Sequence, residues 1–165
     1  MDIEEQYDKV YRYCYMRVGH RQTAEDITQE TFLRFFKNYS YQDMGKFMAY
    51  LYTIARNLCT DYHRKKKEML LPEDYEEKRG KERLGVVFGE SHEETVVVNL
   101  ALREALSCLG QEEQEMILLR YVNELAVADI GKIFGLSRFT VHRRLGKCMA
   151  VLRKELGVPE KGEIL

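Results

Sequence analysis

Proline occurs at only two positions of this 165-residue chain, Pro72 and Pro159, and this scarcity constrains the fold more than any other feature. Proline lacks a backbone donor and clashes with the preceding turn, so it ends or kinks helices. Nearly all of the chain is therefore free to be helical. Apolar residues recur at three- and four-residue spacing, and no segment alternates over a length that would indicate a strand. The sequence predicts an all-α protein.

Three helical patterns lie in the first part of the chain. The first covers residues 3–18 and stops at Gly19, and the second is expected to begin at Thr23 with a spacing similar to a capping box. The third begins at Phe47 and carries a single apolar stripe. Three amphipathic helices suffice for a small bundle, so residues 1–67 are predicted to form the first domain.

The helical pattern fails over residues 68–94, which are predicted to be a flexible acidic linker. This segment contains nine Asp and Glu residues against four Lys and Arg, together with Pro72 and three glycines. Its short apolar island, "LGVVFG", either packs on a neighbouring domain or contacts a partner. The helical pattern then resumes, and residues 95–165 are predicted to be a second bundle of four helices with short connections.

The charge balance of the whole chain conceals two basic segments. There are 26 Lys and Arg against 27 Asp and Glu, for a formal net charge of −1. Residues 46–67 nevertheless hold six bases and one acid, and residues 137–154 hold six bases and no acid. Because attraction to nucleic acid depends on local as well as total charge, both bundles are candidates for DNA binding.

The segment "DIGKIFGLSRFTVHRRL" has the spacing of a helix-turn-helix. Gly131 is expected where two helices pack closely, Gly135 in a turn with positive φ, and Ser137 as the N-cap of the second helix. On a helical wheel the outer face of this second helix combines long cations with small residues, which suits a DNA groove. The alternative is a solvated basic face without a ligand.

The expected third helix and the loop before it place aromatic rings beside cations and hydrogen-bonding side chains. This combination suits single-stranded DNA, whose unstacked bases need flat partners and whose backbone needs cations. The alternative is a tyrosine-rich helix that simply packs into a core. The side chains are Tyr39, Tyr41, Tyr50, Tyr52, Arg56, Asn57, Thr60 and His63.

The expected second helix carries Leu33 on its polar side, among Asp26, Gln29 and Glu30. A single exposed leucine is unremarkable in a soluble protein. A leucine surrounded by polar side chains also resembles a small protein-docking surface. The pattern alone leaves both interpretations open.

Three blocks of the sequence together resemble the extracytoplasmic-function (ECF) sigma factors, the smallest members of the sigma-70 family of bacterial RNA polymerase initiation subunits. The blocks are "AEDITQETFLRFFKNY", "FMAYLYTIARNLCTDYHRKKK" and "LSCLGQEEQEMILLRYVNELAVADIGKIFGLSRFTVHRRLGKCMAVLRKEL". They occur in the family's order and cover both expected bundles.

The resemblance implies a factor that binds core RNA polymerase, through its clamp helices and flap, and directs promoter-specific initiation. The first bundle would bind the polymerase and melt and read the −10 element, and the second would read the −35 duplex. The polymerase-binding residues would be Asp26, Gln29, Glu30 and Leu33. The −35 residues would be Arg138, Phe139, Thr140, His142, Arg143 and Lys147. The −10 residues would be Tyr39, Tyr41, Lys46, Tyr50, Tyr52, Arg56, Asn57, Thr60, His63 and Arg64.

The alternative function is an autonomous helix-turn-helix transcriptional regulator that binds its operator without polymerase. An enzyme is not expected, because no catalytic triad, metal-ligand cluster or phosphate loop is visible, and neither a cofactor nor a metal is predicted. The acidic N-terminus and the absence of a long apolar run predict a cytoplasmic protein without a membrane span. The resemblance also implies an anti-sigma factor as a possible partner.

Overall fold

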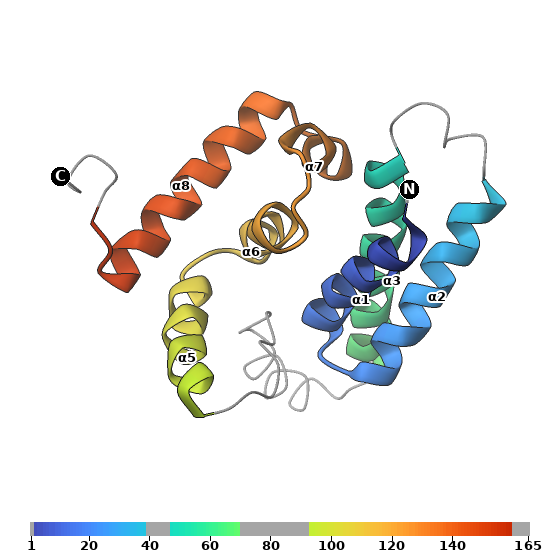
Figure 1. Cartoon of the computed structure of the whole chain (residues 1–165), viewed down its shortest axis with the longest axis horizontal. Helices are drawn as coiled ribbons and strands as arrows, with labels where there is room; N and C mark the ends of the chain where they lie inside the picture. Colours follow the sequence, from blue (N-terminus) through green and yellow to red (C-terminus); the bar gives the residue numbers. More distant parts are fainter. Residues whose placement is uncertain (1, 39–46, 70–92, 160–165) are drawn as a thin grey trace.

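The computed structural model describes residues 2–38, 47–69 and 93–159, with side chains of the last range from residue 100 onward (Figure 1). Every regular element in these ranges is a helix, which confirms the predicted all-α fold. The expected loop with Tyr39 and Tyr41, and nearly all of the predicted linker, lie outside the described residues. None of the described helices is both long enough and apolar enough to span a bilayer.

The first bundle consists of α1 (Ile3–Val18), α2 (Arg21–Lys37) and α3 (Phe47–Met69), coloured blue to green in Figure 1. At the start of α1 the Asp2 carboxylate accepts a hydrogen bond from the Glu5 amide at 3.2 Å, which satisfies one free donor of the first turn. Gly19 ends α1 with a φ of 69°, a conformation that glycine adopts without strain.

Helix α2 begins earlier than the sequence suggested. The pattern predicted a start at Thr23, but the helix runs from Arg21 and His20 is its N-cap. The imidazole Nδ1 of His20 accepts from the Thr23 amide at 3.3 Å. The ring therefore caps the helix in place of the Ser, Thr or Asp side chain that is usual at this position. The expected start at Thr23 was therefore wrong by two residues.

The second bundle contains α5 (Glu93–Ser107), α6 (Gln111–Ile117), α7 (Val127–Phe134) and α8 (Arg138–Leu156). Helix α6 continues directly into a π-helical turn, η2 (Leu118–Val122). The predicted inner face of α8 is buried as expected; its residues are Val141, Leu145, Cys148 and Leu152.

Helices α7 and α8 form the expected helix-turn-helix. A Cβ on Gly131 would lie 2.6 Å from the Leu136 carbonyl oxygen, so the close approach of the turn requires glycine there. Gly135 has a φ of 69°, and the Ser137 hydroxyl accepts from the Thr140 amide at 3.1 Å. All three sequence expectations for this motif are confirmed.

The two bundles pack against each other in addition to being linked by the chain. Helix α7 lies against α3, and α6 lies close to α1 (Figure 1). Residues 114–119, which cross from α6 into η2, are all buried. A single helix in a small bundle exposes one side to water. This segment is covered on both sides because the first bundle lies opposite its own.

Candidate nucleic-acid interface

The outer face of α8 is an exposed cationic surface. Arg138, His142, Arg143 and Lys147 are all exposed, and Phe139 keeps 76% of its surface accessible. No acidic residue occurs in the helix before its last turn. Gly146 lies on the same side with open space where a Cβ would be, so another backbone or a nucleic acid could approach closely. Thr140 is half-buried, and its hydroxyl accepts from Ser137 at 2.9 Å.

Arg144, next to this surface, has a different environment. Its guanidinium donates to Glu112 on α6 at 3.3 Å and also to Glu113. The hydrogen bond from Arg144 lowers the pKa of the Glu113 carboxyl below its usual value. Arg144 therefore joins α8 to α6 within the bundle, whereas the neighbouring Arg143 is exposed.

On α3 the predicted −10 residues fall into two groups, and the first lies beside a hollow of about 190 Å³ between α2 and α3. Tyr50 and Asn57 line it from α3, and the Asn38 amide donates to the Tyr50 hydroxyl at 2.9 Å. Arg34 and Lys37 line it from α2. The hollow thus combines a flat ring, amide groups and two cations, which together suit a nucleobase and its phosphate.

The second group faces α1 and the second bundle. Tyr52 is fully buried, so the expectation that it flanks the outer face of α3 is wrong; its ring packs edge-on against Tyr13. His63 is half-buried with its Nε2 2.6 Å from the Arg17 carbonyl oxygen, and Thr60 accepts from Arg17 at 3.4 Å. Thr60 is exposed on this side of α3, whereas Tyr52 is closed to solvent.

The remaining predicted −10 residues add little to either group. Arg64 is exposed and lies 3.4 Å from Asp61, one turn away on α3. Tyr39, Tyr41 and Lys46 lie outside the described residues. Among the described residues, no group of three or more His, Cys, Asp and Glu side chains could hold a metal ion.

The predicted polymerase-binding residues lie on the outer side of α2. Leu33 keeps 58% of its surface exposed, and Phe36 beside it keeps 40%. Asp26 and Gln29 are exposed, whereas Glu30 is half-buried and accepts from Arg34 at 2.8 Å. A partly apolar surface with polar edges is typical of a protein-binding site.

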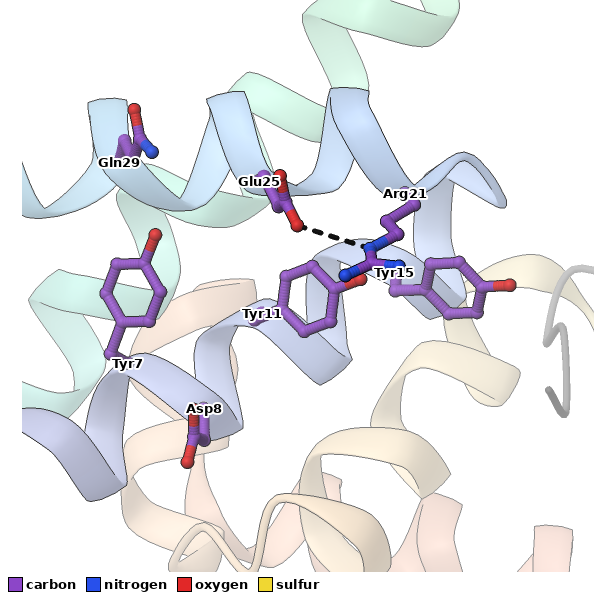
Figure 2. Close-up of a pocket in the computed structure, with 7 residues that line it drawn as sticks. All are labelled: Tyr7, Asp8, Tyr11, Tyr15, Arg21, Glu25 and Gln29. Atoms are coloured by element: carbon purple, nitrogen blue, oxygen red, sulfur yellow. Dashed lines mark hydrogen bonds and ion pairs between the residues drawn. The ribbon is translucent and has the colours of Figure 1, made fainter.

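A groove of about 590 Å³ lies between α1 and α2 (Figure 2), and Gln29 belongs both to its lining and to the predicted polymerase-binding set. Three tyrosines one turn apart on α1 line one wall, and Gln29 lies on the other. At one end of the groove, the Nε of Arg21 donates to the Glu25 carboxylate at 3.4 Å, one turn further along α2. The tyrosines are Tyr7, Tyr11 and Tyr15.

Glu115 on α6 has a structural role that no sequence pattern predicted. This buried carboxylate accepts from the Tyr13 hydroxyl at 2.5 Å and from the guanidinium of Arg17 at 2.9 Å, both on α1. The Nε of Arg56 on α3 donates to the same oxygen at 2.9 Å. One carboxylate of the second bundle thus binds two helices of the first.

Burial governs the ionisation of the groups around Glu115. It raises the pKa of Tyr13 well above the usual value; Arg17 opposes this shift and Glu115 adds to it. Burial alone would lower the pKa of Arg17, but Tyr13 and Glu115 outweigh it, and the net pKa of Arg17 is raised. The tyrosine therefore remains a neutral donor and the arginine remains charged.

Comparison with known proteins identifies the family. The sigma-70 region 2 family matches residues 3–68, and the sigma-70 region 4 family matches residues 105–154. The chain is 35% identical over 160 residues to the ECF RNA polymerase sigma factor SigW of Bacillus subtilis, covering 90% of this chain and 83% of SigW. It is 38% identical over 143 residues to the ECF sigma factor BldN of Streptomyces coelicolor, covering 78% of this chain and 48% of BldN.

A solved structure shares the fold. The sigma factor RpoE of Bartonella quintana, crystallised with the anti-sigma factor NepR, superposes with a TM-score of 0.59 at 19% identity, covering 96% of this chain and 99% of RpoE. The chain belongs to the ECF sigma factors of the sigma-70 family, as the three sequence blocks predicted. This is a family of DNA-binding transcription initiation factors, not of enzymes.

Proposed function

We propose that this protein binds core RNA polymerase and directs initiation at promoters by reading a −35 duplex and melting and reading a −10 element. The observation that carries the proposal is the outer face of α8, where exposed cations without acidic neighbours stand on the second helix of a helix-turn-helix. In this motif the second helix enters the major groove, where side chains reach the base edges. Arg143 and Lys147 would contact bases or phosphates there.

The hollow beside Tyr50 is the proposed site for an unstacked −10 base. The Tyr50 ring could stack with the base, Asn57 could donate and accept hydrogen bonds at its edge, and Lys37 could bind the backbone. Extruding a base from a duplex costs a few kcal/mol, which stacking and hydrogen bonds in such a site would offset. The predicted contacts of Tyr39, Tyr41 and Lys46 would lie on the adjoining loop.

The exposed surface around Leu33 is the proposed contact with polymerase core. Leu33 and Phe36 would supply the apolar centre, and Asp26, Gln29 and Glu30 the polar edge. The groove beside Gln29 enlarges the surface that a partner could cover. An anti-sigma factor, which the resemblance implies as a further partner, would compete for these same surfaces.

Run-off transcription with purified core polymerase tests the proposal. On a library of genomic promoter fragments, we expect discrete transcripts only when both the protein and core are present. A gel-shift with and without core then separates the proposal from an autonomous regulator. Tight, sequence-specific binding by the protein alone, without a stable complex with core, would refute the proposal.

A further inference from the structure

Phe139, the second residue of α8, presents its ring to solvent. It keeps 76% of its surface exposed, more than any other Phe or Tyr in the part of the chain that the structure describes. Removing such a ring from water is favourable. A single exposed apolar residue is common on protein surfaces, so the position of this one and its surroundings determine whether the exposure has a use.

The position of Phe139 is one from which a side chain can read bases. In a helix-turn-helix, residues at the N-terminal end of the second helix contact base edges in the major groove. The Ser137 hydroxyl accepts from the Thr140 amide at 3.1 Å, which fixes the first turn of the helix, from which Phe139 projects. An aromatic ring with two side-chain torsions also loses little conformational entropy when it is held in a contact.

The surroundings of Phe139 suit a duplex better than an apolar protein partner. His142 and Arg143 lie one turn further along the same face and are exposed, whereas the centre of a protein interface is depleted of charge. Gly146 follows Phe139 by nearly two whole turns and so lies almost in line with it. Nothing lies within 4 Å of where its Cβ would be, so the helix could lie deep in a groove.

The chemistry of the major groove selects one partner for a phenyl ring. All four bases present hydrogen-bond donors or acceptors there, and thymine adds a C5-methyl group. A phenyl ring makes no such hydrogen bonds, so contact with a purely polar edge would displace water without replacing its hydrogen bonds. The thymine methyl is the apolar group that the ring can cover without this cost.

We propose that Phe139 is a specificity-determining residue, which recognises a thymine of the −35 duplex by packing on its C5-methyl group. The proposal rests on the proposed function of α8 as the −35 reader and adds the base that this position selects. Arg143 and Lys147 supply attraction to phosphates and polar base edges. Phe139 supplies a preference for one base pair.

Replacement of thymine by uracil tests the contact, because uracil pairs in the same way and lacks only the methyl group. The full-length chain bound to core polymerase first selects from promoter duplexes with a randomised −35 segment, and we expect one position to become thymine. The affinity for the selected duplex is then compared with that for the same duplex with uracil there. We expect the wild type to bind the uracil duplex roughly fourfold more weakly, the factor expected for one methyl-sized group removed from water.

Variants assign this preference to the ring. Phe139→Ala should bind the two duplexes equally, and Phe139→Leu should keep part of the preference because the side chain remains apolar. Leu156→Ala is the matched control: Leu156 is the last residue of α8 and is 41% exposed, so the thymine-to-uracil ratio should stay that of the wild type. Arg143→Ala should weaken binding to both duplexes alike and preserve the ratio. Far-UV circular dichroism checks that each variant folds.

The outcomes separate the thymine contact from the proposed function. Equal affinity of the wild type for both duplexes would refute the contact while the sigma activity stands. Loss of core binding in Phe139→Ala with an unchanged ratio would assign the ring to a protein partner and refute the contact as well. The selection is repeated with the chain alone: if the chain does not bind core, the proposed function fails, and the ratio measured on the chain alone still decides the role of Phe139. If neither form selects a duplex, both proposals fail.

Discussion

The guanidinium carbon of Arg56 lies 4.4 Å from the centre of the Phe134 ring. Arg56 belongs to α3 of the first bundle, and Phe134 is the last residue of α7 in the helix-turn-helix. The motif proposed to read the −35 element thus packs directly on a side chain proposed to read the −10 element. The two surfaces proposed to read the promoter are therefore coupled through a direct side-chain contact.

Replacing Phe134 by Leu should weaken this coupling while keeping an apolar side chain. A cation–π contact at a partly exposed site contributes about 0.5–1 kcal/mol, so the free energy of unfolding should fall by about that amount. Urea denaturation of the full chain measures it. Phe139→Leu is the control, because that ring is 76% exposed and should leave stability unchanged. Equal losses in both variants would contradict a specific contact with Arg56.

Replacing Arg143 by Ala should weaken binding to the −35 duplex by about 1–3 kcal/mol if the side chain contacts bases. The measurement is competition between promoter and unrelated duplexes for the protein bound to core polymerase. Arg144→Ala is the control: its guanidinium binds Glu112 and Glu113, so its loss should reduce stability and leave sequence preference intact. Equal weakening on every duplex by Arg143→Ala would instead indicate a phosphate contact.

Two glycines of the helix-turn-helix should respond oppositely to alanine. In Gly131→Ala the new methyl group would lie 2.6 Å from the Leu136 carbonyl oxygen, and overpacking of this kind costs about 1–3 kcal/mol. Gly146→Ala meets nothing within 4 Å and should stabilise α8 by about 0.5–1 kcal/mol. Thermal unfolding measures both. Loss of −35 binding in the stabilised Gly146→Ala would support close approach of DNA to this face.

Alkaline pH should destabilise the contact between the bundles through Tyr13. Burial raises the pKa of this phenol well above the usual value for tyrosine, so the folded protein retains a proton that the unfolded chain releases. The resulting stability is complete below the unfolded pKa and is lost as pH rises above it. Chemical denaturation from neutral to alkaline pH should therefore show a steep fall in the free energy of unfolding.

The matched variants compare the buried Tyr13 with an exposed tyrosine. Tyr13→Phe loses a hydrogen bond to Glu115 and should be less stable at neutral pH, but its fall above the phenol pKa should be shallower. Tyr121→Phe should retain the full fall, because Tyr121 is 53% exposed. A wild-type slope in Tyr13→Phe would rule out Tyr13 as the titrating group.

Local patterns predicted the parts of the fold that depend on neighbours in sequence. The inner face of α8, the close glycine at 131, the turn at Gly135 and the cap at Ser137 follow from helical spacing and backbone chemistry, and all are present. The three sequence blocks likewise predicted the family, which the matched regions confirm. These features can be predicted without knowing how the two bundles pack against each other.

The contact between the bundles could not be predicted from such patterns. Tyr13 is separated from Glu115 by 102 positions, and Tyr52 from Asn123 by 71. Helical periodicity identifies a stripe that packs within a bundle, and the sequence pattern placed Tyr52 beside the outer face of α3. Nothing in the local sequence distinguishes Glu115, which is buried, from the acids just before it. Burial here depends on a second surface that periodicity does not encode.

The exposed leucine on α2 provides the most direct test of polymerase binding. Leu33→Asp would place a charge at the centre of the proposed contact, and central apolar positions dominate binding energy at protein interfaces. We expect the affinity for core polymerase to fall at least tenfold, that is by about 1.4 kcal/mol or more. Because Leu33 is 58% exposed, the substitution should change the free energy of unfolding by less than about 0.5 kcal/mol.

A second leucine provides the control for this experiment. Leu100 on α5 is 54% exposed but lies outside the predicted polymerase-binding set, so Leu100→Asp should bind core as the wild type does. Affinity is measured by titrating core polymerase against the labelled full-length variants. If Leu33→Asp binds core as tightly as Leu100→Asp does, polymerase must use another surface. A loss confined to Leu33→Asp, with unchanged stability, would assign the outer side of α2 to the polymerase, because the two variants differ only in where the charge is placed.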